Sequence, residues 1–378
     1  MQERRGWIVA IACGLAVAAV AHSHAEAAVI TRIGTLGGSQ SVALDINDAR
    51  QVVGQANVDG DAVAHAYLWH NGTITDLGAL AGDANSAAEG INNLGEVVGW
   101  SEVGSGSFLK NAMLWHGGQT TNINTALGGT STLAWDINDH GTVVGQGNIT
   151  AGFAKGWIWN RNTGGGSAGT LPGYMGGANR AISNNDVVVG HSYFFGDPDH
   201  AHRAVPDGKS GWISEEIGPA GYGLSVATDV NDAGTMVGYA QVEDSAPWSA
   251  VIFTGDAKNP VIDLGRLEGF AETEANAINA SGIIVGMAYP IDPFEDVAHA
   301  WVYMNGQMHD LNDLVDLGNE WQVLLNATGI NAAGDIVGTG ITADGLLAGF
   351  VVSGVVPSPG TIALVLAGAG LVAARRRR

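Results

Sequence analysis

Two short segments of this sequence combine acidic and aromatic residues whose side chains could bind a ligand. The segment 194–202 contains Phe194, Phe195, Asp197 and Asp199. The segment 289–297 contains Asp292, Phe294, Glu295 and Asp296. Aromatic rings offer apolar faces, and carboxylates accept hydrogen bonds, so together they could form a ligand patch. The candidate ligand residues are therefore Asp197, Asp199, Glu295 and Asp296.

Metal binding and catalysis have weaker support. The run Asp45-Ile46-Asn47-Asp48 resembles the start of a calcium loop, but alanines stand at the fifth and twelfth positions, Ala49 and Ala56. The sequence has no nucleophile elbow, no phosphate-binding glycine loop before a helix and no His-Glu-x-x-His motif. We therefore predict no enzymatic activity and no cofactor, with calcium binding as the open alternative.

A motif that recurs along the chain must position these residues. The pattern Ile-Asn-x-x-Gly-x-x-Val-Gly is complete at 91–99. Its seven copies start at Ile46, Ile91, Ile137, Ile182, Val230, Ile278 and Ile330. Neighbouring copies start 45 to 52 residues apart. A period of this length, built from short apolar runs and turn residues, is typical of β-propeller blades.

The motif itself predicts a hairpin. An Asn followed three residues later by Gly suits a type I turn between two paired strands. Arg50 and Asp186 replace the turn glycine in the first and fourth copies, so these two turns are predicted to be strained or rearranged. The fourth copy also has Ser183 in place of the turn Asn, and Pro206 falls in its expected third strand.

Each repeat predicts four antiparallel strands, which make one blade. In the second repeat they cover about 84–91, 96–101, 111–116 and 120–124. The segment 30–38 resembles a fourth strand, whereas the last repeat ends on a third strand at 349–352. The N-terminal strand is therefore predicted to complete the last blade and to close a ring of seven blades.

Side chains of the third strands favour a structural role. Trp69, Trp115 and Trp159 recur at one repeat position and alternate with small residues, as packing between blades requires. We also assign one common position to His65, His202 and His299. A metal site needs convergent ligands, and other residue types fill this position in the remaining repeats. Both sets are predicted to be structural.

The charge balance excludes some partners. The chain has 16 basic and 37 acidic residues, and 10 basic and 36 acidic residues remain without Glu3 and the arginines at both ends. Nucleic acids and anionic membranes bind proteins through basic surfaces. The strongly acidic body therefore argues against both as partners.

The first 28 residues are predicted to be a helical signal peptide. Arg4 and Arg5 precede an apolar stretch and several small residues, and cleavage is predicted after Ala25 or Ala27. The only cysteine, Cys13, lies in this segment, so the mature protein has no disulfide chemistry.

The last segment, 355–378, is distinct from the body at 29–354. It contains Pro357, Ser358 and Pro359, then an apolar run at 362–374, then Arg375, Arg376, Arg377 and Arg378. The apolar run has 13 residues, fewer than the about 20 that span a bilayer comfortably. Terminal arginines keep such an end on the cytoplasmic side. We therefore predict a short transmembrane helix that serves as a transient anchor.

This tail resembles the PEP-CTERM sorting signal. In that family a membrane exosortase recognises the signal, and the protein is processed and exported to the cell surface. The body, over about 30–354, resembles the HAF-repeat family of extracellular proteins, on third-strand starts that read His65-Ala66-Tyr67 and His299-Ala300-Trp301. The two resemblances imply a bacterial exported protein that an exosortase-type enzyme processes, with no established activity.

The sequence therefore predicts a non-enzymatic propeller scaffold at the cell surface or in the extracellular matrix, transiently anchored in the inner membrane. Its partners would be extracellular polysaccharide or envelope proteins. The alternative is an extracellular propeller hydrolase, lyase or lectin that acts on polysaccharide. The segments 194–202 and 289–297 fall at equivalent places in the fourth and sixth repeats, so they could share one rim.

Overall fold

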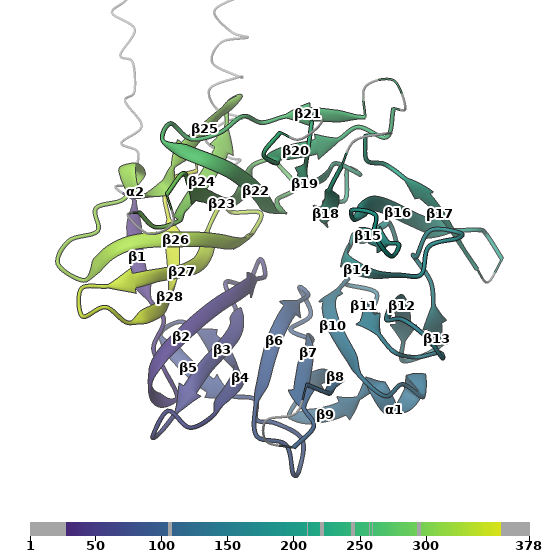
Figure 1. Ribbon diagram of the computed structural model, residues 1–378. Helices are drawn as coiled ribbons and strands as arrows, with labels where there is room; N and C mark the ends of the chain where they lie inside the picture. Colours follow the sequence, from purple (N-terminus) through teal and green to yellow (C-terminus); the bar gives the residue numbers. More distant parts are fainter. Residues whose placement is uncertain are drawn as a thin grey trace, which may run out of the picture.

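Each copy of the motif forms one four-stranded antiparallel sheet, and the seven sheets surround a central axis (Figure 1). The computed structural model describes residues 28–104, 108–209, 211–219, 223–242, 246–256, 258, 260–292 and 296–356. The predicted signal peptide with Ala25 and Ala27, the sorting residues from Pro357 onward and Glu295 lie outside the described residues. The predicted seven-bladed β-propeller is confirmed.

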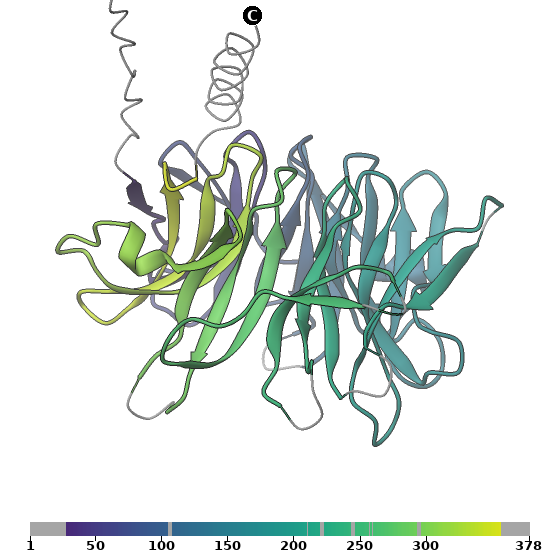
Figure 2. The ribbon, with the colours of Figure 1, turned by 90° about the horizontal axis from the view of Figure 1, so that it is seen from above.

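Successive strands of each blade run outward from the axis, and Figure 2 shows the ring from the side. Blades 1 and 2 comprise β2 (Gly37–Ile46), β3 (Val52–Val58), β4 (Ala64–His70) and β5 (Thr73–Asp76), then β6 (Ser86–Ile91), β7 (Val97–Glu102), β8 (Lys110–His116) and β9 (Gln119–Asn122). Blades 3 and 4 comprise β10 (Thr132–Ile137), β11 (Thr142–Gly147), β12 (Lys155–Asn160) and β13 (Gly164–Ser167), then β14 (Gly176–Ile182), β15 (Val188–Tyr193), β16 (His200–Pro206) and β17 (Trp212–Glu216).

The remaining blades follow the same order. Blades 5 and 6 comprise β18 (Ser225–Val230), β19 (Met236–Ala240), β20 (Ser249–Phe253) and β21 (Val261–Asp263), then β22 (Phe270–Ile278), β23 (Ile284–Pro290), β24 (His299–Met304) and β25 (Gln307–Asp310). Blade 7 comprises β26 (Trp321–Ile330), β27 (Ile336–Thr342), β28 (Leu347–Ser353) and β1 (Val29–Arg32). Two short helices follow fourth strands: α1 (Ile123–Leu127) and α2 (Leu311–Leu314). Within the described ranges, no helix is long and apolar enough to cross a membrane.

The ring closes through its two ends. β1 pairs antiparallel with β28, from Val29 opposite Ser353 to Arg32 opposite Phe350, and the two strands lie side by side in Figure 1. The predicted closure by an N-terminal strand is therefore confirmed. Because blade 7 combines the first and last strands of the propeller, neither end can leave the sheet without exposing a strand edge.

The motif asparagine forms the hairpin and also links neighbouring blades. In blade 1, the Arg50 N–H donates to the Asn47 carbonyl at 3.0 Å, while Asn47 Oδ1 accepts from the N–H groups of Ala49 and Gln51. Asn47 Nδ2 donates to the Asn92 carbonyl in blade 2 at 3.0 Å. Equivalent bonds of 3.0 to 3.3 Å leave Asn92, Asn138, Asn231, Asn279 and Asn331, the last returning to Asn47. Ser183 has no amide, so it interrupts this circle once.

The two unusual turns keep the common geometry at a cost in strain. Arg50 and Asp186 adopt φ values of 59° and 57°, in the left-handed region that glycine occupies elsewhere. Arg50 offsets part of this cost across the ring seam, because its Nε lies 3.1 Å from Asp335 Oδ2 of blade 7. The strain expected from the sequence is present, and neither turn is rearranged. Blade 4 is complete, since Pro206 lies at the exposed end of β16.

The closing glycine of each motif allows a close approach between strands. Every innermost strand carries a β-bulge opposite this glycine, as between Ala88 and Gly90 in blade 2. A Cβ at Gly99 would lie within 3.0 Å of the carbonyl oxygen of Ala87 on the inner strand, and the other six closing glycines face inner-strand carbonyls in the same way. Any side chain here would push the innermost strand away, so glycine is required in all seven copies.

Three half-buried aspartates in blades 1, 3 and 5 add a second link between blades. Asp229 accepts the N–H of Val230 in its own blade and that of Ile278 in the next, both at 2.7 Å. Asp45 and Asp136 bridge in the same way. Burial raises the pKa of Asp136 to about 6, and burial together with the charge of Asp136 raises that of Asp229 to about 7. The carboxyls of Asp136 and Asp229 therefore titrate between about pH 6 and 7.

The core lies between blade faces. Trp69, Trp115 and Trp159 are buried and 5 to 7% exposed, which agrees with the core role predicted for them. The prediction that His65, His202 and His299 share one repeat position is wrong for His202. His200, and not His202, shares the strand register of His65 and His299. His202 lies two residues further along, fully buried, between Ser192 and Asn179.

Two replacements of Asn279 distinguish the contribution of its turn to stability from the contribution of its hydrogen bond to the next blade. Asn279→Ser should keep an acceptor for the turn, as Ser183 does in blade 4, but it removes the donor to the Asn331 carbonyl. We expect the free energy of unfolding to fall by about 1 kcal/mol for Asn279→Ser and by about 2–3 kcal/mol for Asn279→Ala, measured by urea denaturation. Equal losses in the two variants would mean that the link between blades contributes nothing.

The raised pKa of Asp229 predicts a pH-dependent stability. An Asp in an unfolded chain has a pKa of about 3.9, so between pH 4 and 7 the folded state holds a proton that the unfolded state has lost. The contribution of Asp229 to the free energy of unfolding therefore declines as pH rises through this window. The free energy of unfolding of Asp229→Asn, taken relative to that of the wild type, should therefore rise by about 3 kcal/mol between pH 4.5 and pH 8.

The quantity to compare is the difference in the free energy of unfolding between the variant and the wild type. Burial lowers the pKa of His202 to about 3, so His202 changes the pH dependence in the opposite direction, but it does so equally in both proteins. Asp232→Asn changes an exposed carboxylate on the same hairpin and is the matched control. A difference for Asp229→Asn that does not vary with pH would contradict the assignment.

Candidate functional site

The seven β-bulges place seven unlike side chains around the axis. The extra residue of each bulge, called here a channel position, is Leu44, Glu89, Trp135, Arg180, Thr228, Asn276 or Thr328. All seven are half-buried, whereas the residue directly before each is fully buried and is alanine in six blades and Asn179 in blade 4. A bulge re-aims a side chain out of the ladder. The innermost strands therefore present a varied set of groups to a central channel.

Contacts between blades confirm that the channel positions converge. The Arg180 guanidinium lies 4.6 Å from the ring centroid of Trp135 in the preceding blade. Burial lowers the pKa of Arg180, and the charges of Glu89 in blade 2 and Glu274 in blade 6 oppose that effect. Asn276 Nδ2 donates to Asn326 Oδ1 of blade 7 at 2.7 Å. Groups from blades 2, 3, 4, 6 and 7 thus interact near the axis.

Glu89 forms one side of this set. The Trp100 Nε1–H donates to Glu89 Oε1 at 2.7 Å, and Lys110 Nζ lies 3.0 Å from the Trp100 ring centroid. Burial raises the pKa of Glu89, while the Trp100 hydrogen bond and the charges of Arg180 and Lys110 lower it. A carboxyl, an indole and an ammonium group are therefore stacked on blade 2.

Three aromatic rings and a carboxyl form the other side. The ring of Trp248 lies 6.3 Å from that of Tyr239 and 6.4 Å from that of Tyr289, measured between centroids. The Tyr289 hydroxyl donates to Glu274 Oε2 at 3.0 Å. Burial raises the pKa of Glu274, and burial raises that of Tyr239 to about 12. Because all four side chains are half-buried, this aromatic cluster keeps surface exposed to solvent.

Two polar groups in these walls have unused hydrogen-bonding capacity. Among the described residues, Arg180 Nε and Trp248 Nε1 are buried and have no hydrogen-bond partner. A buried donor without a partner costs about 1–3 kcal/mol, so water or a ligand is the expected partner. Core tryptophans such as Trp115 and Trp157 share this feature, so it is compatible with polar groups in the channel but does not by itself identify a site.

The candidate residue Asp199 lies beside this set. Its Oδ2 is 3.7 Å from His191 Nε2, and burial raises its pKa. Burial and the charge of Arg180 lower the pKa of His191 to about 3, which leaves the imidazole neutral. One of the four rim candidates from the sequence therefore joins the channel groups.

The other rim candidates lie further out. Asp197 is in the loop between β15 and β16, and Asp296 is in the loop between β23 and β24. Both loops join the second and third strands of a blade, so they lie on the same face of the ring. Asp296 is exposed, and its side chain accepts the N–H of Val297. Asp197 and Asp296 are thus placed on one rim, and Glu295 is not described.

No metal centre emerges from the described part of the chain, where no three His, Cys, Asp or Glu side chains group together. The run at 45–48 that resembles a calcium loop binds backbone instead. Asp45 bridges two blades, and Asp48 Oδ1 accepts the N–H of Ala332 at 2.9 Å. The hairpin end of the channel, a cavity of about 200 Å³, is lined by the three leading residues of all seven motifs.

Sequence reasoning missed the channel positions, although a signal for them was present. The residue two places before each motif Ile or Val takes six types in seven repeats, as Glu89, Trp135 and Arg180 show, although the motif beside it is regular. Such variation within a repeat marks a position that is free of the repeat's packing constraints.

No protein-family model matches this chain, and no curated protein matches it. Solved structures that are similar include TolB from Acinetobacter baumannii, with 9% sequence identity and a TM-score of 0.40 over 85% of this chain and 65% of that chain. A gluconolactonase from Xanthomonas campestris has 9% identity and a TM-score of 0.41 over 85% of this chain and 91% of its own. A triple arginine mutant of AofleA from Arthrobotrys oligospora has 12% identity and a TM-score of 0.36, over 75% of this chain and 90% of its own.

Proposed function

We propose that this chain is an exported bacterial protein whose propeller binds extracellular polysaccharide without altering it chemically. The leader-like segment at 1–28 and the tail at 355–378 support export, with the tail acting as a transient membrane anchor for an exosortase-type enzyme. The resemblance to HAF-repeat proteins supports a place at the cell surface or in the extracellular matrix. The acidic body speaks against nucleic acid as the ligand.

The observation that carries the binding proposal is the combination of aromatic and carboxyl groups in the channel. A sugar ring has hydroxyl groups around its edge and apolar C–H faces. Aromatic rings such as Trp248 and Tyr239 can cover those faces. Glu89 and Glu274 each have a second oxygen that no donor of the described residues occupies and that can accept a hydroxyl. Sites with mostly apolar walls and a few fixed polar groups are typical of specific ligand binding.

The alternative is a hydrolase or lyase, and one observation favours it. Burial raises the pKa of both Glu89 and Glu274, and a raised pKa favours the protonated form that a general acid needs. Retention of the full chain on the organism's own polysaccharide, with and without calcium, distinguishes the two functions when released oligosaccharide is monitored. Retention without release supports binding, and release of fragments supports catalysis.

Replacing Trp248 or Glu274 tests the channel directly. Trp248→Ala and Glu274→Gln remove an aromatic face and a charged acceptor, so we expect affinity for the polysaccharide to fall at least about tenfold, or about 1.4 kcal/mol. Affinity electrophoresis of the full chain measures this change. Ile262→Ala on the exposed outer strand of blade 5 is the matched control. Wild-type affinity in both channel variants would exclude the channel as the binding site.

The rim is tested separately. Replacing Asp197, Asp199, Glu295 and Asp296 together by the corresponding amides should weaken retention several-fold, because Asp199 adjoins the channel groups through His191. Thermal unfolding of the variant shows whether the fold is retained. If every detected binding activity survives the four replacements, the rim takes no part in binding.

A further inference from the structure

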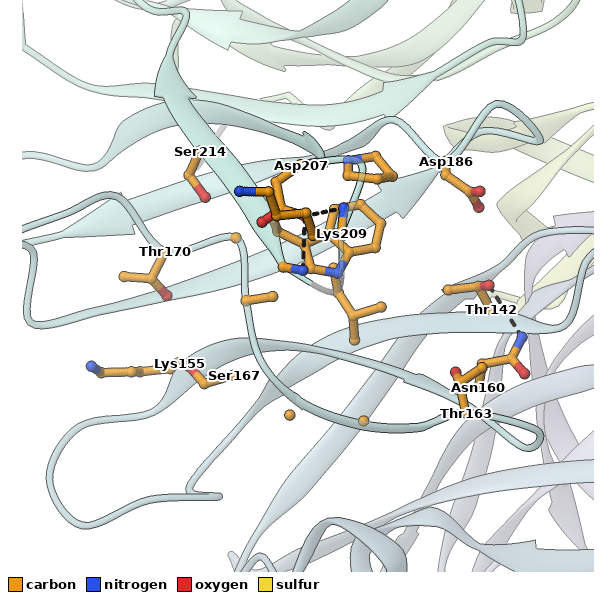
Figure 3. A pocket seen from close by; sticks show the side chains of 18 of the residues that line it. Thr142, Lys155, Asn160, Thr163, Ser167, Thr170, Asp186, Asp207, Lys209 and Ser214 are labelled. Atoms are coloured by element: carbon orange, nitrogen blue, oxygen red, sulfur yellow. Dashed lines mark hydrogen bonds between the residues drawn. The ribbon is translucent and has the colours of Figure 1, made fainter.

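A large cavity lies away from the channel, between the outer parts of blades 3 and 4. Its volume is about 1090 Å³, compared with about 200 Å³ at the hairpin end of the channel. One side is formed by β12, β13 and the connecting residues 168–174, and the other by the hairpin that joins β16 to β17. Figure 3 shows Lys155, Asn160 and Ser167 of blade 3 across from Asp207 and Ser214 of blade 4. This cavity is called the groove below.

The groove exists because blade 3 lacks side chains where the other blades have them. Gly166 of β13 pairs with Ile158, which lines the groove, so both residues face blade 4. The equivalent positions in the other blades carry side chains: Thr31, Thr75, Thr121, Glu215, Ile262 and His309. Adjacent blades diverge towards the outside, and only between blades 3 and 4 does glycine leave that space open.

The lining is polar and has free positive charge. Two of the four lysines in the chain, Lys155 and Lys209, line the groove, and neither has an ion-pair partner among the described residues. The carboxylates are engaged locally. Asp207 Oδ1 accepts the N–H groups of Lys209 and Gly211, and Asp186 Oδ1 accepts from Asn138 Nδ2 at 2.9 Å.

Neutral hydrogen-bonding groups and one aromatic wall complete the groove. The hydroxyl and amide side chains belong to Thr142, Asn160, Asn162, Thr163, Ser167, Thr170 and Ser214. The half-buried Trp212 packs against the apolar cluster between the two blades and presents part of its ring. A ligand with many hydroxyl groups, apolar ring faces and dispersed negative charge matches this lining.

We propose that the groove is a second glycan site, which binds a segment of an acidic, carboxylate-bearing polysaccharide. This inference rests on the proposed polysaccharide binding and deepens it by naming the class of chain. Nucleic acid would require a denser row of basic groups than two lysines in an acidic body. A groove of this volume has room for several sugar units, since cavities of about 300–1,000 Å³ hold drug-sized ligands. With the channel, the groove would allow one propeller to join two polysaccharide chains.

The test compares a polyuronate with a neutral glucan on the full chain, using alginate oligomers and dextran as probes. Gly166→Phe fills the groove without disturbing the strand, because a Cβ at Gly166 has no heavy atom within 4 Å. Thr75→Phe places the same side chain at the equivalent position of blade 1 and is the matched control. Lys155→Gln combined with Lys209→Gln removes the free charge and leaves the shape.

We expect the wild type to bind alginate oligomers at least tenfold more tightly than dextran, and salt to weaken the binding. Gly166→Phe should reduce that affinity tenfold or more, the double lysine variant should reduce it several-fold, and Thr75→Phe should leave it unchanged. Wild-type affinity in Gly166→Phe, equal affinity for the two probes, or no loss in the double lysine variant would each overturn the proposal. If retention on the native polysaccharide responds to Trp248→Ala and not to Gly166→Phe, the channel proposal stands and the groove proposal fails.

Discussion

The fold depends on the hydrogen bonds that leave the motif asparagines. Seven hairpins converge on the axis, where their backbone groups are buried and must find partners. An asparagine meets this need, because its side-chain oxygen caps its own turn while its Nδ2 reaches the carbonyl of the next blade. The bond from Asn331 to Asn47 joins the last hairpin to the first and so supports the ring closure made by β1 and β28. Ser183 shows that the turn survives when the link between blades is lost.

The need for these hydrogen bonds determines at which positions of the repeat the residue type can vary. The motif asparagine, the closing glycine and the valine before that glycine are required by the axis, by the close inner strand and by the core. The bulge residue varies more: all seven channel positions differ except for two threonines, although Thr228, Asn276 and Thr328 donate hydrogen bonds to carbonyls of the next blade. The outer strand is also under little constraint, which is why blade 3 can carry glycine at 164–166. The two candidate binding regions thus occupy the positions that the repeat leaves free.

The same distinction explains what the sequence could predict. Blade number, strand order and the seam between β1 and β28 follow from a local pattern that repeats, and the strain at Arg50 and Asp186 follows from two missing glycines. The channel could not be predicted, because Glu89 of blade 2 and Glu274 of blade 6 come near Arg180 of blade 4 only when the ring closes. The error with His202 has a similar cause: His200 and His202 lie on the same face of one strand, and only the pairing with β15 distinguishes them. The groove could have been predicted from the sequence, because blade 3 has a run of glycines where the six other blades carry side chains.

The hydrogen bonds of the channel carboxyls bear on the choice between binding and catalysis. A general acid must release its proton to the leaving group and regain it in each cycle. Glu89 and Glu274 each accept a hydrogen bond from a fixed donor, Trp100 and Tyr289, and both donors favour the ionised form of the carboxyl they contact. An ionised, immobilised carboxylate is a good acceptor for sugar hydroxyls and a poor proton donor. Burial outweighs these donors and raises both pKa values, but the hydrogen bonds fix each carboxyl in one orientation, which suits recognition of a chain more than repeated proton transfer. The local hydrogen bonds therefore favour a binding propeller over a hydrolytic one.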